Sequence, residues 1–410
     1  MPLKVIVVGA GLGGLAASIS LKLGLPTHDV LVVESATELA EVGAGLQLTP
    51  NATRLLVNWG LKDSLESLAS SPEEFLVRRH DGHKLLGSRS NFACEMLDKY
   101  GSFYWDIHRA DLQIAMFERA KGLGVRFQFG TTVMEVISKT AEIVTDKKEI
   151  IGGDLVVAAD GLWSNTRSSV LGGPSVPIPT GDLAYRIVLR SEDLTDPGLQ
   201  EFVKIPRVCL WVGPECHAIF YPVKNNTMVN IVLLVPDNLP DNVDRMPGNL
   251  EEMKEIFSKW DPLYVYASTH SPAIAWGHIV NMDELETWYN DEATVAFLGD
   301  SCHPMLPYMA QGAGSALEDG AALGNILSAI HDKKDLPQGL RVYQDRHINH
   351  LPDGPEQVER DAIAEAQVYD QSPGYPFYWL DPAAQEFVYG YDVIEELEKR
   401  HVNAASGPNL

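Results

Sequence analysis

Cysteine is scarce in this sequence, which has only four in 410 residues. None of the four is part of a CxxC pair, so the sequence indicates neither a zinc site nor a disulfide framework, and a reduced compartment is expected. Long apolar runs are also lacking, because no stretch approaches the roughly 18 residues of a membrane span. No apolar leader precedes the first predicted strand. We therefore expect a soluble, cytoplasmic protein with no membrane partner.

Basic residues are the second shortage, since 32 Lys and Arg face 56 Asp and Glu for a formal net charge of -24. This balance excludes nucleic acid as a partner, because a phosphate backbone is bound by clustered basic side chains. No GxSxG nucleophile elbow is present, which argues against a serine hydrolase. His303 beside Cys302 lacks the further ligands of a zinc site, so we expect no metal centre.

The N-terminal stretch carries the strongest motif. A short β-branched strand ends at Gly9, and a glycine-rich turn then leads into a helix and a second strand, Val30–Val33. In such a turn, Gly9 allows the tight bend, Gly11 lets the backbone approach a pyrophosphate, and Gly14 lets the helix pack against the strand. Glu34 is placed to accept hydrogen bonds from ribose hydroxyls. The pattern predicts a dinucleotide site at the positive end of the helix.

Two further segments indicate contact with the same ligand. Glu41–Asn51 is an apolar loop that includes Gly45, and its glycines favour close approach of the backbone to a flat ligand, although a plain loop is the alternative. A helix is predicted from about Arg109 to Gly122. Arg109 in the first turn opposes the helix dipole, which indicates that it faces an anion, unless it is a simple surface arginine.

Two buried strands later in the chain end in an acid. The first, Leu155–Ala159, leads to Asp160, and the second, Ala293–Leu298, leads to Asp300. Acids at the carboxyl ends of parallel strands lie where ligands of doubly wound sheets bind. For Asp160, a purely structural cap at the strand end is the alternative.

Between these two strands the pattern changes. Alternating strands separated by polar turns predict an antiparallel sheet inserted into the dinucleotide-binding fold, and a last helix is predicted over Pro382–Arg400. The expected architecture is therefore α/β, a Rossmann-like domain with an inserted antiparallel-sheet substrate domain and C-terminal helices. The predicted dinucleotide-binding segments are 1–72, 100–173 and 285–335, the substrate-domain segments are 73–99 and 174–284, and the C-terminal helical segment is 336–410.

One strand of the inserted sheet has a pattern suited to an aromatic substrate. His217, Ile219 and Tyr221 share one face, with the outer two Cα atoms roughly 13 Å apart, which leaves room for a ring over Ile219. A histidine of pKa about 6.5 is a natural proton acceptor near pH 7. A structural histidine beside a core tyrosine is the alternative. On another strand, Arg186 faces opposite to Tyr185 and is suited to hold a carboxylate, or else lies on a solvated face.

Three motifs in order carry a resemblance to a known family. They are Gly9-x-Gly11-x-x-Gly14 with Glu34, then Asp160-Gly161-x-x-Ser164-x-x-Arg167, then Gly299-Asp300-x-x-His303-Pro304-x-x-Pro307-x-x-x-Gln311-Gly312-x-Gly314. Together they resemble the single-component (class A) FAD-dependent aromatic monooxygenases, in particular the salicylate-hydroxylase-like branch. The similarity covers nearly the whole chain.

The resemblance implies an FAD cofactor and roles for individual residues. Asp300 is expected to bind the ribityl chain and Arg109 the FAD phosphate or ribityl region. Gly312-Ala313-Gly314 is expected to place a helix N-terminus at the pyrimidine edge of the flavin, where the reduced form carries negative charge. Asp160 and Arg167 are expected to contribute to binding of both FAD and the nicotinamide coenzyme.

The resemblance also implies the reaction. His217 and Tyr221 are expected to contact a phenol, with Arg186 as the third catalytic residue. The other expected substrate contacts are Gln47, Tyr185, Ile219, Pro307 and Gln311. The expected function is hydroxylation of a phenolic or electron-rich aromatic with NAD(P)H and O2 through a flavin C4a-hydroperoxide, in a monomer or homodimer. An epoxidase, an indole-type oxygenase and a non-oxygenating flavoprotein are the alternatives.

Overall fold

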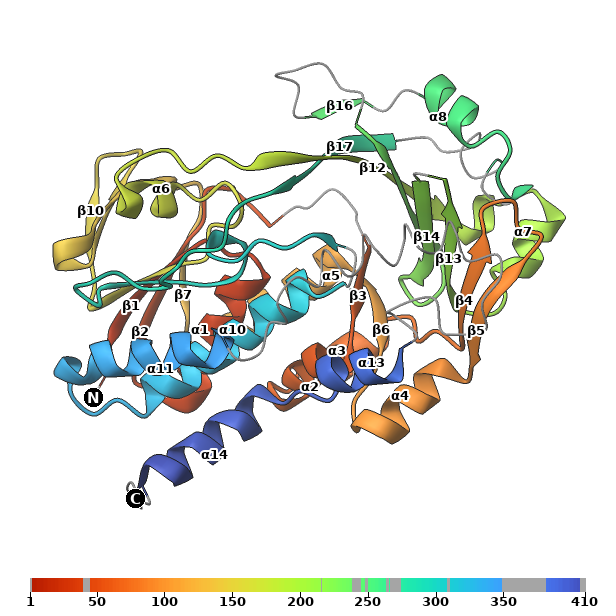
Figure 1. The fold of residues 1–410 in the computed structure, drawn as a ribbon. Helices are drawn as coiled ribbons and strands as arrows, with labels where there is room; N and C mark the ends of the chain where they lie inside the picture. The colour runs from red at the N-terminus through yellow and green to blue at the C-terminus, as the bar shows by residue number, and fades with distance from the viewer. Residues whose placement is uncertain are drawn as a thin grey trace.

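The computed structural model describes residues 2–39, 45–214, 216–237, 245–247, 250–262, 265, 274–307, 310–348 and 381–405. Its first layer is a five-stranded parallel sheet with the order β18-β11-β1-β2-β7 (Figure 1). These strands are β1 (Lys4–Val8), β2 (Asp29–Val33), β7 (Arg126–Gln128), β11 (Leu155–Ala158) and β18 (Val295–Phe297). Every strand pair in it is parallel, as predicted for the doubly wound domain.

Two helices far apart in the sequence pack in parallel beside this sheet: α1 (Leu12–Gly24) and α10 (Gly312–Ser328). Small residues make the close approach possible, because a Cβ at Gly320 would lie 2.5 Å from the backbone N of Ala17. A Cβ at Gly324 would likewise overlap Ser20. Since the contacts advance in the same direction on both helices, their N-termini lie side by side at the carboxyl edge of the sheet.

The remaining α-helices of the described residues lie around the two large sheets (Figure 1). They are α2 (Pro50–Asn58), α3 (Lys62–Glu66), α4 (Phe92–Tyr100), α5 (Arg109–Gly122), α6 (Asn165–Leu171), α7 (Pro197–Phe202), α8 (Leu250–Ile256), α11 (Leu336–Ile348), α13 (Pro382–Tyr389) and α14 (Val393–Ala405). The single helix predicted over Pro382–Arg400 is wrong, because the chain forms two helices there. Asp392 separates them by accepting hydrogen bonds from the N–H groups of Ile394 and Glu395, at 3.0 and 3.2 Å.

The second large sheet has eight strands in the order β16-β17-β12-β15-β14-β13-β4-β5. They are β4 (Glu74–Arg79), β5 (Leu85–Ser90), β12 (Ile178–Arg190), β13 (Arg207–Gly213), β14 (Cys216–Val223), β15 (Met228–Pro236), β16 (Arg245–Pro247) and β17 (Ile274–Asn281). Its pairs are antiparallel, as predicted, with the exception of β13 and β4, which pair in parallel. A smaller antiparallel sheet holds β8 (Val133–Ile137), β9 (Glu142–Thr145) and β10 (Ile150–Gly152).

The eight-stranded sheet has two different faces. The face that carries Tyr185, Ala218 and Phe220 forms a hydrophobic core, to which Phe202 of α7 and Met253 of α8 also belong. Side chains of the opposite face alternate with these along each strand. Long strands β12 and β17 reach from this sheet toward the parallel sheet (Figure 1).

A two-stranded ribbon of β3 (Gly45–Leu48) and β6 (Trp105–His108) lies between the two large sheets (Figure 1). Leu48, Trp105 and Ile107 pack into the core of the parallel sheet. Because side chains alternate along a strand, Gln47 and Asp106 lie on the other face of the ribbon. This arrangement brings the polar face of the ribbon to β14 and β15.

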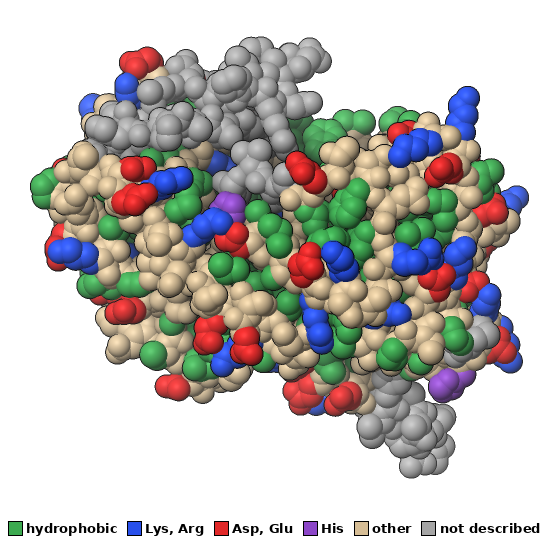
Figure 2. All heavy atoms as spheres, turned by 180° about the vertical axis from the view of Figure 1, so that it is seen from behind, with side chains coloured by type: hydrophobic (Ala, Val, Ile, Leu, Met, Phe, Trp, Pro, Cys, Tyr) green, Lys and Arg blue, Asp and Glu red, His purple; other side chains and the backbone are tan. Residues whose placement is uncertain are grey.

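No helix in the part of the chain that the structure describes is long and apolar enough to span a membrane. Within the same residues, no group of three or more His, Cys, Asp or Glu side chains is arranged to hold a metal ion. On the face shown in Figure 2, acidic and basic side chains both occur across the surface.

Candidate functional site

The glycine turn after β1 has three glycines with three different surroundings. Gly9 has a φ of +101°, and a Cβ there would lie 2.5 Å from the carbonyl oxygen of Ala159. A Cβ at Gly14 would overlap the carbonyl oxygen of Gly9, so α1 rests directly against the strand. At Gly11, by contrast, no described atom lies within 4 Å of an added Cβ. The open space is therefore beside Gly11, at the N-terminus of α1, where it suits a pyrophosphate.

Glu34 follows β2 and lies beside this turn. Its Oε2 accepts a hydrogen bond from the backbone N–H of Ala10 at 2.7 Å, and its Oε1 accepts one from Ala36 at 2.8 Å. The carboxylate is thus held at the edge of the glycine turn. This fixed position fits an acceptor for ribose hydroxyls.

Asp300 and Arg109, from distant parts of the chain, lie within electrostatic reach of one another. Asp300 follows β18 in a short 3-10 helix, and Arg109 begins α5. Burial raises the pKa of the Asp300 carboxyl, whereas the positive charges of His303 and Arg109 lower it. The Asp300 side chain is nevertheless exposed, at the end of the sheet where β18 leaves it. The pair fits the phosphate and ribityl region of FAD.

A buried ion pair supports the Asp300 turn from behind. Asp319 Oδ2 lies 2.6 Å from His303 Nε2 and accepts a hydrogen bond from the Gly299 N–H at 2.8 Å. The imidazole also stacks on Trp288 at a ring distance of 4.5 Å. Burial alone lowers the pKa of His303, but the Asp319 charge outweighs it and holds that pKa well above its usual value. Cys302, next to His303 in the chain, is a buried free thiol.

Asp160 forms hydrogen bonds with the start of α6. Its Oδ1 accepts a hydrogen bond from Ser164 Oγ at 2.6 Å and its Oδ2 one from the Thr166 N–H at 3.0 Å. Arg167 donates to the carbonyl oxygens of Asp283 and Ser301 at 2.6 and 3.4 Å. Both side chains therefore hold α6 and the Asp300 turn, and their roles toward FAD and the nicotinamide coenzyme stay predictions.

The N-terminus of α10 is braced by a hydrogen-bond network that sequence reasoning missed. Gln311 Oε1 accepts a hydrogen bond from Asn51 Nδ2 and its Nε2 donates to Thr49 Oγ1, each at 3.2 Å. Asn51 Nδ2 also donates to Glu318 Oε1 at 2.8 Å. Both ends of the Gln311 amide are thus engaged within the protein, and they position Gly312-Ala313-Gly314. Pro307 is exposed, and 308–309 lie outside the described residues.

The structure brings the predicted substrate strand to the ribbon. Ile219 and Tyr221 lie on the sheet face opposite to Ala218 and Phe220, and His217 shares their alternation. A Cβ on Gly45 would lie 2.5 Å from Tyr221 Cε2. The residues 40–44 of the predicted flavin-facing loop lie outside the described residues, whereas Gly45 is placed at the ribbon.

Arg186 joins this face, and Tyr185 does not. Arg186 and Ile219 both pair with Val232 of the strand between them, so they share one face. Burial raises the pKa of Tyr221, as does Asp106, whereas the Arg186 charge lowers it. Tyr185 is fully buried in the opposite core, where its hydroxyl lies 3.5 Å from Glu252, so the structure does not support its predicted substrate role.

Burial changes the expected chemistry of His217. Part of the His217 side chain is accessible to solvent. The surrounding protein nevertheless removes enough water from the imidazole to lower its pKa from 6.5 to about 4. The imidazole is therefore neutral at pH 7. It is a weaker base in the free protein than the ordinary histidine expected from the sequence.

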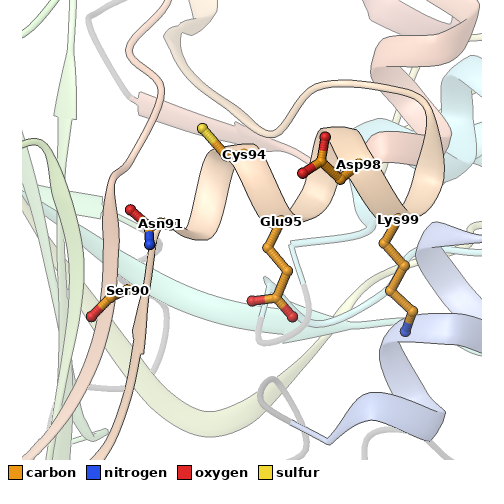
Figure 3. A pocket seen from close by; sticks show the side chains of 6 residues that line it. All are labelled: Ser90, Asn91, Cys94, Glu95, Asp98 and Lys99. Carbon is orange, nitrogen blue, oxygen red and sulfur yellow. The ribbon is translucent and has the colours of Figure 1, made fainter.

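A shallow pocket elsewhere is not part of this site. It is lined by residues of α4 and the end of β5, which are Ser90, Asn91, Cys94, Glu95, Asp98 and Lys99 (Figure 3). Two of them form ion pairs, Glu95 with Arg89 and Lys99 with Glu386. None of the predicted site residues lines this pocket.

A family model described as an FAD binding domain matches residues 2–350. The chain belongs to the FAD-dependent monooxygenases of this family, which confirms the class A resemblance and makes it an FAD-containing oxidoreductase.

Curated relatives and solved structures agree with this class. The chain is 43% identical over 96% of each chain to FAD-dependent monooxygenase OpS4 of Beauveria bassiana (strain ARSEF 2860). It is 30% identical, over 83% of its length and 86% of the relative's, to a 3-hydroxybenzoate 6-hydroxylase of Klebsiella oxytoca. The fold is similar to that of CtdE in complex with FAD and substrate, with a TM-score of 0.82, 21% identity, and 98% and 99% of the two chains covered.

Proposed function

We propose that the protein hydroxylates a phenolic or similarly electron-rich aromatic with NAD(P)H and O2. One oxygen atom enters the ring and the other leaves as water, with NAD(P)H supplying two electrons. The observation that carries this proposal is the contact between Gly45 of the ribbon and Tyr221 of the substrate strand, which sets the His217–Tyr221 face against the cofactor-binding half. The relative named 3-hydroxybenzoate 6-hydroxylase supports an aromatic substrate.

Bound FAD would supply the redox chemistry of this reaction, the transfer of electrons from the coenzyme to oxygen. The residues suited to hold it are the open cradle at Gly11, the Glu34 carboxylate, the Arg109 and Asp300 pair, and the N–H groups at Gly312, Ala313 and Gly314. The parallel packing of α1 and α10 supports this assignment, because it aims two positive helix ends at one edge of the sheet.

His217 is the proposed proton acceptor for the substrate hydroxyl. A neutral imidazole accepts the hydrogen bond of a phenol at neutral pH, and a phenolate formed beside it raises the basicity of the ring. Arg186 is the proposed partner for the developing negative charge or for a substrate carboxylate. Ile219 lies between His217 and Tyr221 on the same strand and offers an apolar contact for the ring.

The test is to screen phenolic acids, resorcinols and indoles for stimulation of NAD(P)H oxidation and to identify products by mass in labelled O2. We expect incorporation of one labelled oxygen atom into a phenolic substrate. His217→Ala should retain FAD, lower hydroxylation and raise the share of NAD(P)H that ends as hydrogen peroxide. Stimulated oxidation without incorporation would contradict oxygenation, and an epoxide or oxidised indole would identify one of the alternative oxygenases.

A further inference from the structure

The polar face of the ribbon carries a buried acid whose function is not explained by the fold. Asp106 of β6 is fully buried, and its Oδ1 accepts a hydrogen bond from Gln47 Nε2 at 3.1 Å. The two residues pair directly across the ribbon. The backbone of Asp106 bridges to Ser70 in both directions at 2.8 Å, a role that needs no carboxyl group.

The buried polar atoms without a hydrogen-bond partner among the described residues include two at this interface, one on β6 and one on β15. One is Asp106 Oδ2 and the other is Asn230 Nδ2, and both are buried. Asn230 Oδ1 accepts from the Gly45 N–H at 3.0 Å, so its amide orientation is determined by the ribbon. Buried polar groups are normally paired, and an unpaired one calls for a bound group or for another explanation.

The Asp106 carboxyl acts on the proposed substrate face. Asp106 contributes to the raised pKa of Tyr221, and Arg186 on the sheet lowers the same pKa. Tyr221 therefore lies within electrostatic reach of both the ribbon acid and the sheet cation. Strands β6 and β14 also contact one another directly.

We propose that Asp106, held by Gln47, forms a subsite that binds a hydroxyl substituent of the aromatic substrate through Asp106 Oδ2. The proposal rests on the proposed function for its aromatic ligand and adds a residue that determines specificity. The hydrogen bond from Gln47 occupies Oδ1 and leaves Oδ2 to the ligand. A ring hydrogen or methyl group at this position leaves Oδ2 unpaired.

The protonation state of Asp106 suits this ligand. Burial raises the pKa of its carboxyl well above the usual value, with the Gln47 hydrogen bond opposing the shift. Burial therefore favours the protonated carboxyl, which both donates and accepts hydrogen bonds. A ring hydroxyl has the same two capacities, and sites that hydrogen-bond a hydroxyl discriminate strongly against analogues that lack it.

Binding to the oxidised, FAD-loaded protein tests the subsite without coenzyme or turnover. The probes are phenol and its three dihydroxy derivatives, catechol, resorcinol and hydroquinone, and binding is followed by the change in flavin absorbance. We expect at least one dihydroxybenzene to bind about tenfold tighter than phenol to the native protein. Asp106→Leu should abolish that preference, so that the two ligands bind about equally tightly. Asp106→Asn, which keeps the shape of the side chain, should show an intermediate preference.

The matched control is Asp261→Asn. Asp261 is also a buried acid, but it accepts a hydrogen bond from Trp211 Nε1 at 2.8 Å on the other face of the sheet. This variant should retain the native preference. If Asp106→Leu does not fold, Asp106→Asn and Gln47→Leu carry the same comparison, each with its FAD content and unfolding midpoint measured.

The proposal is overturned if the native protein shows no preference for a second hydroxyl or if folded Asp106 variants keep the native ratio. Failure of the proposed function gives a different result. In that case the Asp106 variants lose the binding preference, while native protein with NAD(P)H and labelled O2 forms no oxygenated product.

Discussion

Gly45 and Tyr221 are in such close contact that a Cβ atom on the glycine would lie 2.5 Å from Cε2 of the tyrosine ring. Gly45 also donates its N–H to Asn230 Oδ1 at 3.0 Å. These two contacts join the ribbon, which packs on the parallel sheet, to the strands of the eight-stranded sheet. The relative position of the proposed cofactor and substrate residues depends on them.

Gly45→Ala should therefore displace Tyr221 and weaken ligand binding at the proposed substrate face. We expect a loss of about 1–3 kcal/mol in unfolding free energy from overpacking, with FAD still bound. Urea denaturation and flavin absorbance measure the two effects. Gly122→Ala is the control, because no described atom lies within 4 Å of a Cβ there. Equal unfolding midpoints for the two variants would show that the ribbon adapts without cost.

Two substitutions in the glycine turn should have different effects, one on FAD binding and the other on the stability of the apoprotein. Gly11→Ala has free space for its methyl group, so we expect unchanged stability of the apoprotein and at least about tenfold weaker FAD binding. Gly14→Ala should instead destabilise the apoprotein by about 1–3 kcal/mol, because its methyl group overlaps the Gly9 carbonyl oxygen. FAD titration and urea denaturation of both apoproteins make the comparison. Unaltered FAD affinity in Gly11→Ala would contradict binding of the FAD pyrophosphate at this turn.

Asp319→Asn should leave the His303 imidazole buried without its charge partner. Breaking a buried ion pair typically costs about 3–5 kcal/mol, and here the Gly299 N–H also changes its acceptor. Asp29→Asn removes an exposed pair with Arg126 and should cost no more than about 1 kcal/mol. The urea midpoints of the two variants at pH 7 give the comparison, and equal losses would argue against a charged His303.

His217 should make the protein less stable as the pH falls from about 6.5 toward 4. Its folded pKa of about 4 lies below the unfolded value of 6.5, so in this window the unfolded chain binds a proton that the folded chain does not. His217→Gln should therefore gain stability relative to the native protein at pH 5 but not at pH 8. Urea midpoints at the two pH values test this. A stability difference that is the same at both would place the folded pKa near 6.5.

Asp106 should make the protein less stable as the pH rises, which is the opposite of the effect of His217. Burial raises its folded pKa, so the folded chain keeps a proton that the unfolded chain releases as the pH rises above about 4. The native protein therefore loses stability with rising pH until the folded pKa is passed. Asp106→Asn removes this dependence, so its stability relative to the native protein should increase from pH 4 to pH 8. A decreasing difference would mean that Asp106 is ionised in the fold.

The local sequence patterns were sufficient for much of the architecture. The glycine spacing at Gly9, Gly11 and Gly14 encodes a strand–turn–helix within a few residues, and β-branched runs mark the buried parallel strands. The period of two along 217–221 placed its alternate side chains on one face. These are properties of neighbouring residues, so they can be inferred without knowing the rest of the fold.

Which face meets which partner is decided only by tertiary contacts. Alternation shows that Tyr185 and Arg186 point in opposite directions, but only the packing of Tyr185 against Glu252 and of the sheet against the ribbon assigns the inward side. Asp106 was missed for the same reason, because a single acid in a strand has no sequence signal, and only the fold buries its carboxyl within electrostatic reach of Tyr221. The pairing of α1 with α10 likewise depends on two glycines about 300 residues from their partners. Sequence periodicity therefore determined the elements, whereas long-range burial determined which of their side chains form the site.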